Sequence, residues 1–133
     1  MPRRTKKPKP LRVVIADDHR LFAEALEAIL AADERIEVVG QAGDGSKAVE
    51  LARTLDPDLV LMDVSMPVLD GFEATREIRA AAEDVRVLML TGSNSRADVD
   101  RSREVGASGY ITKDRIASEL VAAIVEVSRR RLP

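Results

Sequence analysis

The chain has no cysteine or tryptophan, and only three of its 133 residues are aromatic: Phe22, Phe72 and Tyr110. The lack of cysteine excludes disulfides, thiolate metal sites and cysteine nucleophiles. Apolar runs reach only about six residues, whereas a membrane-spanning helix needs roughly 20. The apolar run behind the basic start is also too short for a signal peptide. We therefore expect a cytoplasmic protein that does not contact a membrane.

Positive charge is concentrated at the start of the chain. Residues 1–10 contain three prolines and five of the 21 Lys and Arg residues, but no acid. The remaining residues carry 16 basic against 23 acidic side chains, a net charge of −7. Such a start cannot bury apolar surface, so we predict a disordered basic arm over residues 1–10 and a folded domain over 11–131. The acidic body argues against direct DNA binding by that domain.

Five apolar runs alternate with segments of helical periodicity, which is typical of an α/β protein with a parallel sheet. Strands are expected near residues 11–16, 36–42, 59–63, 86–90 and 109–112. The first helix should bury Leu21, Phe22, Ala25, Leu26, Ile29 and Leu30, the third Phe72, Thr75 and Ile78, and the last Leu120, Ile124 and Val127. The second should follow Gly45 and Ser46 and end before Asp56-Pro57.

The fourth predicted helix, roughly residues 96–105, is unusually polar. It offers only Ala97, Val99 and Val105 for burial. Packing should therefore hold this helix weakly, as is typical of a solvated helix or of an element that changes conformation.

Polar residues follow four of the apolar runs: Asp17, Asp18, Asp63, Thr91 and Lys113. Each has an ordinary explanation as a cap, a turn residue or a solvated lysine. In a parallel sheet, however, the carboxyl ends of the strands meet at one edge. Three acids there would repel one another unless a divalent cation and a lysine joined them.

Such a set suits phosphoryl transfer. A carboxylate can attack a phosphoryl donor to form an aspartyl-phosphate, and Mg²⁺ binds one or two protein carboxylates together with phosphate oxygens. A lysine supplies a point charge for another phosphate oxygen. A nearby hydroxyl can then respond to the added group.

The chain resembles the receiver domain of bacterial two-component response regulators. The matching segments are VVIADDH at 13–19, LVLMDVSMPVLDGFEATREIR at 59–79, VLMLTG at 87–92 and GASGYITKD at 106–114. The segment ADDHRLFAEALEAIL is similar to receivers that usually precede a helix-turn-helix output domain. The resemblance implies a doubly wound, flavodoxin-like sheet of order 2-1-3-4-5 with helices on both faces.

The resemblance also implies residue roles. Asp63 would accept a phosphoryl group, with Lys113 and Thr91 contacting that group. Asp18, Asp63 and the backbone carbonyl of Ser65 would bind Mg²⁺, and Asp17 would assist through water. Thr91 and Tyr110 would shift on phosphorylation.

The implied partners are a histidine kinase or phosphotransfer protein and a downstream effector, with homodimerisation open. Phosphorylation would change the face formed by the fourth helix, the fifth strand and the last helix. The protein would be a switch that gains and loses its own phosphoryl group rather than a turnover enzyme.

Three other interpretations remain open. The chain could be the receiver part of a longer DNA-binding regulator, depending on whether the reading frame continues past Pro133. An aspartate phosphohydrolase is disfavoured because the first strand ends in Asp-Asp-His rather than the D-x-D arrangement of such enzymes. The segment 43–48 fits G-x-G-x-x-A, a dinucleotide-binding pattern, but that reading leaves the acids and Lys113 unexplained.

Overall fold

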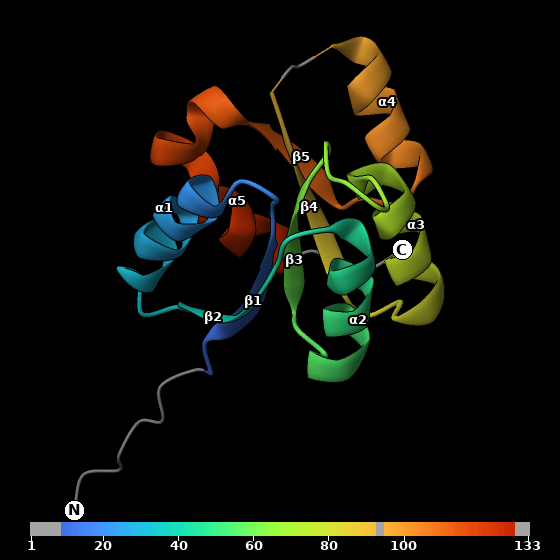
Figure 1. Cartoon of the computed structure of the whole chain (residues 1–133). Helices are drawn as coiled ribbons and strands as arrows, with labels where there is room; N and C mark the ends of the chain where they lie inside the picture. Colours follow the sequence, from blue (N-terminus) through green and yellow to red (C-terminus); the bar gives the residue numbers. More distant parts are fainter. Residues whose placement is uncertain (1–8, 93–94, 130–133) are drawn as a thin grey trace, which may run out of the picture.

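Five parallel strands form one sheet in the order β2-β1-β3-β4-β5 (Figure 1). The computed structural model describes residues 9–92 and 95–129. The first eight residues of the predicted arm and the end of the predicted domain, residues 130–131, therefore lie outside the described ranges. The sheet confirms the predicted α/β class and strand order.

The observed strands match the predicted ones closely; only β4 is one residue longer. They are β1 (Leu11–Ala16), β2 (Ile36–Ala42), β3 (Leu59–Asp63), β4 (Arg86–Thr91) and β5 (Gly109–Thr112). The helices are α1 (Arg20–Ala31), α2 (Gly45–Leu55), α3 (Gly71–Ala81), α4 (Arg96–Glu104) and α5 (Ile116–Arg129), with a 3₁₀ turn η1 (Lys113–Arg115) before the last. No helix in the described ranges is long and apolar enough to cross a bilayer.

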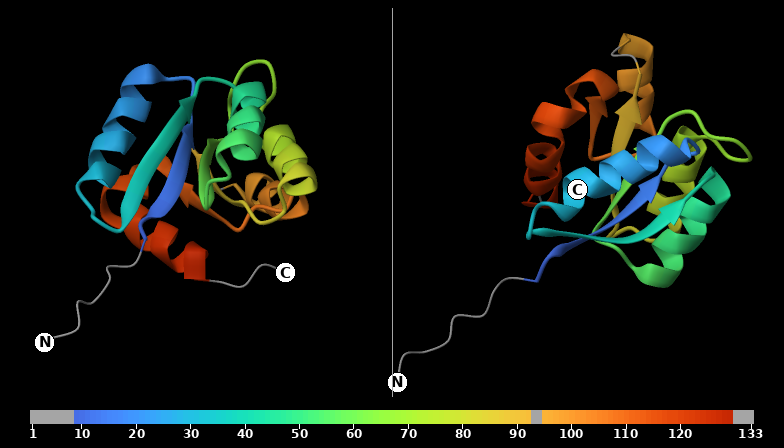
Figure 2. Two further views of the ribbon diagram at one scale, coloured as in Figure 1. Left: turned by 90° about the horizontal axis from the view of Figure 1, so that it is seen from below. Right: turned by 60° about the vertical axis from the view of Figure 1, so that its left-hand side comes forward.

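Helices cover both faces of the sheet, as the two further views make clear (Figure 2). Successive residues of a strand point to opposite faces. Val13 and Ile15 of β1 pack with α1 and α5, whereas Val14 packs with α2 and α3. All three valine and isoleucine side chains are fully buried. The central strands are therefore apolar on both sides, and polar residues are confined to their ends.

The predicted inner face of α1 is partly wrong. Leu26 and Leu30 are buried as expected, but Leu21 is 82% exposed and Ala25 also faces solvent. Ala23 is buried in their place. A helical period alone therefore locates the buried side of α1 only approximately.

Local signals explain how the helices next to the site begin and end. The Asp44 carboxylate accepts a hydrogen bond from the Lys47 backbone N–H at 2.8 Å, and Asp70 accepts one from Glu73 at 2.9 Å. These side chains cap α2 and α3 by satisfying free backbone donors. Asp56 ends α2 with φ 47°, one residue before Pro57, which confirms the predicted stop.

Candidate functional site

Carboxylates from two adjacent strands meet at the carboxyl edge of the sheet. Asp17 follows β1 and Asp63 ends β3, and the register pairs Ala16 with Met62, the residues that precede them. Asp17, Asp18, His19 and Asp63 each offer one ligand atom, and all four atoms lie within 4.8 Å of one another. The parallel register therefore brings together acids that are 46 positions apart in sequence.

These carboxylates are shielded from water to different degrees. The side chains of Asp17 and Asp63 are 0% and 3% exposed, while that of Asp18 is 33% exposed. Burial raises the pKa of Asp63, and the negative charge of Asp17 raises it further. Lys113 and the Ser65 backbone N–H oppose this increase, without cancelling it. The site therefore carries more buried negative charge than its own cation offsets.

Two buried carboxylate oxygens indicate which kind of ligand the site can bind. Among the described residues, the Oδ2 atoms of Asp17 and Asp63 are buried without a hydrogen-bond partner. A buried carboxylate oxygen without a partner is costly. A hard divalent cation prefers carboxylate oxygens, so these two atoms and Asp18 fit Mg²⁺, which would supply the missing positive charge.

Lys113 provides the one cation in direct contact with Asp63 in the described structure. It lies in η1 directly after β5, and its Nζ atom is 3.4 Å from Asp63 Oδ1. The same Nζ atom lies 4.8 Å from the centroid of the Phe22 ring in α1. The sequence predicted that Lys113 would meet Asp63, but it gave Phe22 only as a core residue.

Of the other predicted site residues, Ser65 and Thr91 lie at the acidic edge of the sheet, whereas Tyr110 does not. The Ser65 backbone N–H donates to Asp63 Oδ1 at 3.3 Å. Thr91 ends β4 at the same edge and is 4% exposed. Tyr110 instead lies on β5 with 42% of its surface exposed, where it lines a pocket outside the acidic cluster.

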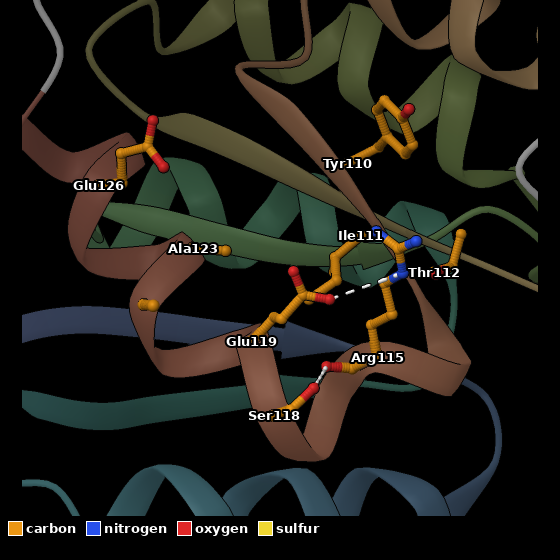
Figure 3. A pocket seen from close by; sticks show the side chains of 9 residues that line it. Tyr110, Ile111, Thr112, Arg115, Ser118, Glu119, Ala123 and Glu126 are labelled. Atoms are coloured by element: carbon orange, nitrogen blue, oxygen red, sulfur yellow. Dashed lines mark hydrogen bonds and ion pairs between the residues drawn. The ribbon is translucent and has the colours of Figure 1, made fainter.

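That pocket lies between β5 and α5 and has a volume of about 310 Å³. Figure 3 shows Tyr110 on the strand, with Arg115, Ser118 and Glu119 on the turn and helix that follow. Arg115 and Glu119 form an ion pair at 3.6 Å. The pocket contains none of the three acids, so it is a separate surface.

The loop between β3 and α3 folds tightly over the end of β3. The Gly71 N–H donates to the Val64 carbonyl at 2.9 Å, and a Cβ at Gly71 would overlap the Asp63 carbonyl. Val68 in this loop has φ 70° and is 81% exposed. Positive φ is strained for a β-branched residue, and such strain is common beside functional sites.

The glycine-rich segment 43–48 has a packing explanation. A Cβ at Gly45 would overlap the backbone carbonyl of Leu69 in the β3–α3 loop. Gly45 is therefore needed for α2 to approach that loop. The acids and Lys113 gather at a different set of strand ends, which leaves the dinucleotide interpretation without structural support.

The sequence profile of the response regulator receiver domain matches residues 13–125. The chain belongs to this family. Members act as signalling switches, and the observed sheet order and acidic edge agree with that assignment. The receiver-domain resemblance predicted from the motifs is confirmed.

Curated relatives are transcriptional regulators. The chain is 40% identical to the transcriptional regulatory protein DegU of Brevibacillus brevis over 90% of its own length and 50% of the relative's. It is 45% identical to PdtaR of Mycobacterium tuberculosis over 92% of its length and 59% of the relative's. The chain thus spans only about half of each of these proteins.

A solved structure of a receiver domain has the same fold as this chain. The signal receiver domain of the putative response regulator NarL from Mycobacterium tuberculosis superposes with a TM-score of 0.89 at 35% identity. The match covers 93% of this chain and all of that domain. The described structure therefore has the receiver fold.

Proposed function

We propose that this receiver domain accepts a phosphoryl group on Asp63 from a cytoplasmic histidine kinase or phosphotransfer protein. The observation that carries the proposal is the position of Asp63. It is a buried carboxylate that meets Lys113 at 3.4 Å and lies in one acidic cluster with Asp17 and Asp18. Phosphoryl transfer depends mainly on such positioning and on neutralisation of charge.

In the proposed reaction an Asp63 carboxylate oxygen attacks the phosphorus of a phosphohistidine. The new O–P bond gives an acyl phosphate, the P–N bond breaks, and the electron pair leaves with the imidazole of the donor. Lys113 holds one phosphoryl oxygen as a point charge, and Thr91 donates its hydroxyl to the phosphoryl group. Asp18, Asp63 and the Ser65 carbonyl would hold Mg²⁺, with Asp17 assisting through water, and the bound ion would neutralise negative charge.

The phosphoryl group would add a charge of about −1.5 to −2. Repacking of Thr91 and Tyr110 would transmit this change to the face formed by α4, β5 and α5. The pocket beside Tyr110 lies on this face, which makes it a suitable contact for a downstream effector or a second copy of the chain. The domain would gain and lose its own phosphoryl group and would not act as a turnover enzyme.

A second candidate is the receiver part of a longer transcriptional regulator. The lengths of the relatives favour it, because this chain spans 50% to 59% of DegU and PdtaR. In that case a helix-turn-helix domain would contact DNA, and this net-acidic body would not. The two candidates share the same phosphorylation site.

Incubation with acetyl phosphate and Mg²⁺, followed by intact-mass measurement, tests the acceptor. The wild-type chain should gain the mass of one phosphoryl group, and Asp63→Asn should gain none. Asp70→Asn is the matched control, because it removes an acid from the same loop while Asn still caps α3. A gain of phosphoryl mass by Asp63→Asn, or no gain by the wild type, would refute the assignment of Asp63 as the acceptor. Repeated hydrolysis of a generic phosphate ester would instead support a phosphohydrolase.

A further inference from the structure

His19 is the only histidine in the chain and directly follows Asp17 and Asp18. It occupies the N-cap position of α1 but its side chain makes no capping hydrogen bond. Ser, Thr, Asp and Asn are the residues that favour this position, because their oxygens accept from the first turn. Capping of α1 therefore does not account for a histidine at this position.

The imidazole is directed at the acidic cluster. Its Nδ1 atom lies 3.2 Å from Asp18 Oδ1 and 3.5 Å from Asp17 Oδ1. The backbone supports this arrangement, since the His19 N–H donates to Asp17 Oδ1 at 2.8 Å. A single ring N–H cannot donate well to two carboxylates at these distances, whereas a cation between them would serve all three groups.

A second observation, independent of the clustering, points to a missing ligand. The Oδ2 atoms of Asp17 and Asp63 are buried without a partner among the described residues, on side chains that are 0% and 3% exposed. One ligand atom from each of these two acids, from Asp18 and from His19 lies within 4.8 Å of the others. The donor set therefore contains three carboxylates and one imidazole nitrogen.

This donor set differs in kind from one made of oxygens alone. Mg²⁺ prefers carboxylate, carbonyl and water oxygens, whereas imidazole suits zinc, copper, iron and nickel. Divalent transition ions also bind N and O ligands with affinities that rise along the first row to copper. An imidazole at the rim should therefore strengthen the binding of such ions and leave Mg²⁺ binding unchanged.

We propose that His19 is a further ligand of this site and gives it a preference for a divalent transition ion of the Co²⁺, Ni²⁺ or Zn²⁺ class over Mg²⁺. The inference rests on the proposed metal site of Asp17, Asp18 and Asp63 and extends it to the choice of ion. The side chain of His19 is 71% exposed, so the ring is free to turn toward an ion that enters from solvent.

Calorimetric titration of the full, untagged chain with NiCl₂ and, separately, MgCl₂ tests the preference. Removal of a group that only supports a ligand already costs on the order of tenfold in metal affinity. His19→Asn should therefore weaken Ni²⁺ binding by about tenfold or more, with Mg²⁺ affinity unchanged within about twofold. Arg20→Gln, at the next position, where the side chain is also mostly exposed, is the matched control and should change neither affinity.

Proton NMR of the Co²⁺-loaded chain provides a direct signature. A hyperfine-shifted, exchangeable imidazole N–H resonance is expected from the wild type and must come from His19, since the chain has no other histidine. It should be absent from His19→Asn. Asp63→Asn should lose both Ni²⁺ and Mg²⁺ binding, which places the ion at the same site.

The outcomes separate this inference from the proposed function. Equal Ni²⁺ affinities in wild type and His19→Asn, with Mg²⁺ still bound at Asp63, would overturn the role of His19 alone. Ni²⁺ binding that survives Asp63→Asn would place the ion elsewhere and would also overturn it. Failure of the wild type to bind either ion would overturn the proposed metal site itself.

Discussion

At the scale of single residues, the ammonium of Lys113 is held from two sides. Asp63 Oδ1 attracts it at 3.4 Å, and the centroid of the Phe22 ring in α1 lies 4.8 Å away. The negative face of an aromatic ring attracts a cation within about 6 Å by about 0.5–1 kcal/mol, and more when the pair is shielded from water. The Lys113 side chain is only 29% exposed, so Phe22 limits the directions in which the ammonium can turn.

Phe22→Leu should therefore slow the phosphorylation of Asp63 by acetyl phosphate by about threefold to tenfold. The leucine keeps the apolar contact but lacks the ring face, so Lys113 would sample positions away from Asp63. Phe22→Tyr, which keeps the ring, should retain nearly the wild-type rate. Equal rates for the leucine and tyrosine variants would show that the ring face does not position Lys113.

The site residues at the strand ends could be predicted from the sequence, whereas the side-chain contacts between different helices and strands could not. Asp17, Asp63 and Lys113 follow apolar runs, and the geometry of parallel sheets dictates that such positions converge. The pairing of Phe22 with Lys113 depends on the direction of a ring in α1 and of a side chain after β5. Helical periodicity predicts that a residue is buried, but not which charged group lies over it.

At the scale of secondary-structure elements, α4 is attached mainly by polar contacts. Ser102 is its one buried residue. The Arg101 guanidinium lies 4.5 Å from the centroid of the Phe72 ring in α3, and it pairs with Glu73 at 3.9 Å. Exposed ion pairs contribute little, so the stacking on Phe72 is the more important of the two contacts.

Arg101→Ala should raise the amide hydrogen-exchange rates of α4 by about threefold, because loss of the cation–π contact costs roughly 0.5–1 kcal/mol of local stability. The other helices should exchange at unchanged rates. Arg103→Ala removes another exposed cation from the same helix and is the control. If both variants alter α4 exchange equally, general helix propensity rather than the Phe72 contact is responsible.

The polar character of α4 could be predicted from the sequence, but its contacts could not. Val105 is buried as expected, whereas Ala97 is exposed. Ser102 is buried in its place, and its hydroxyl donates to the Asp98 carbonyl at 2.9 Å. In so polar a helix, apolar residues are too few to define one face, and the sequence does not reveal that Arg101 packs on Phe72.

At the scale of the whole molecule, the acidic edge opposes folding when no metal is present. Folding raises the pKa of Asp63 above its value of about 3.9 in an unfolded chain. Between these two pKa values the folded state binds more protons than the unfolded state. The free energy of unfolding of the metal-free chain therefore falls as pH rises from below the unfolded pKa through the folded one.

Urea unfolding of the chain in a metal chelator should consequently show that Asp63→Asn is more stable than the wild type at pH 7. The difference should shrink as pH is lowered and disappear near pH 3, where both chains are neutral at this position.

Mg²⁺ at ten times its dissociation constant should add about 1.4 kcal/mol to the free energy of unfolding of the wild type, and much less to that of Asp63→Asn. Asp33→Asn is the control, because Asp33 lies outside the acidic cluster and hydrogen bonds from Arg35 lower the pKa of its carboxyl to about 2. A wild type that is more stable than Asp63→Asn in chelator at pH 7 would show that Lys113 and Ser65 already offset the buried charge, so that the site needs no cation for its stability.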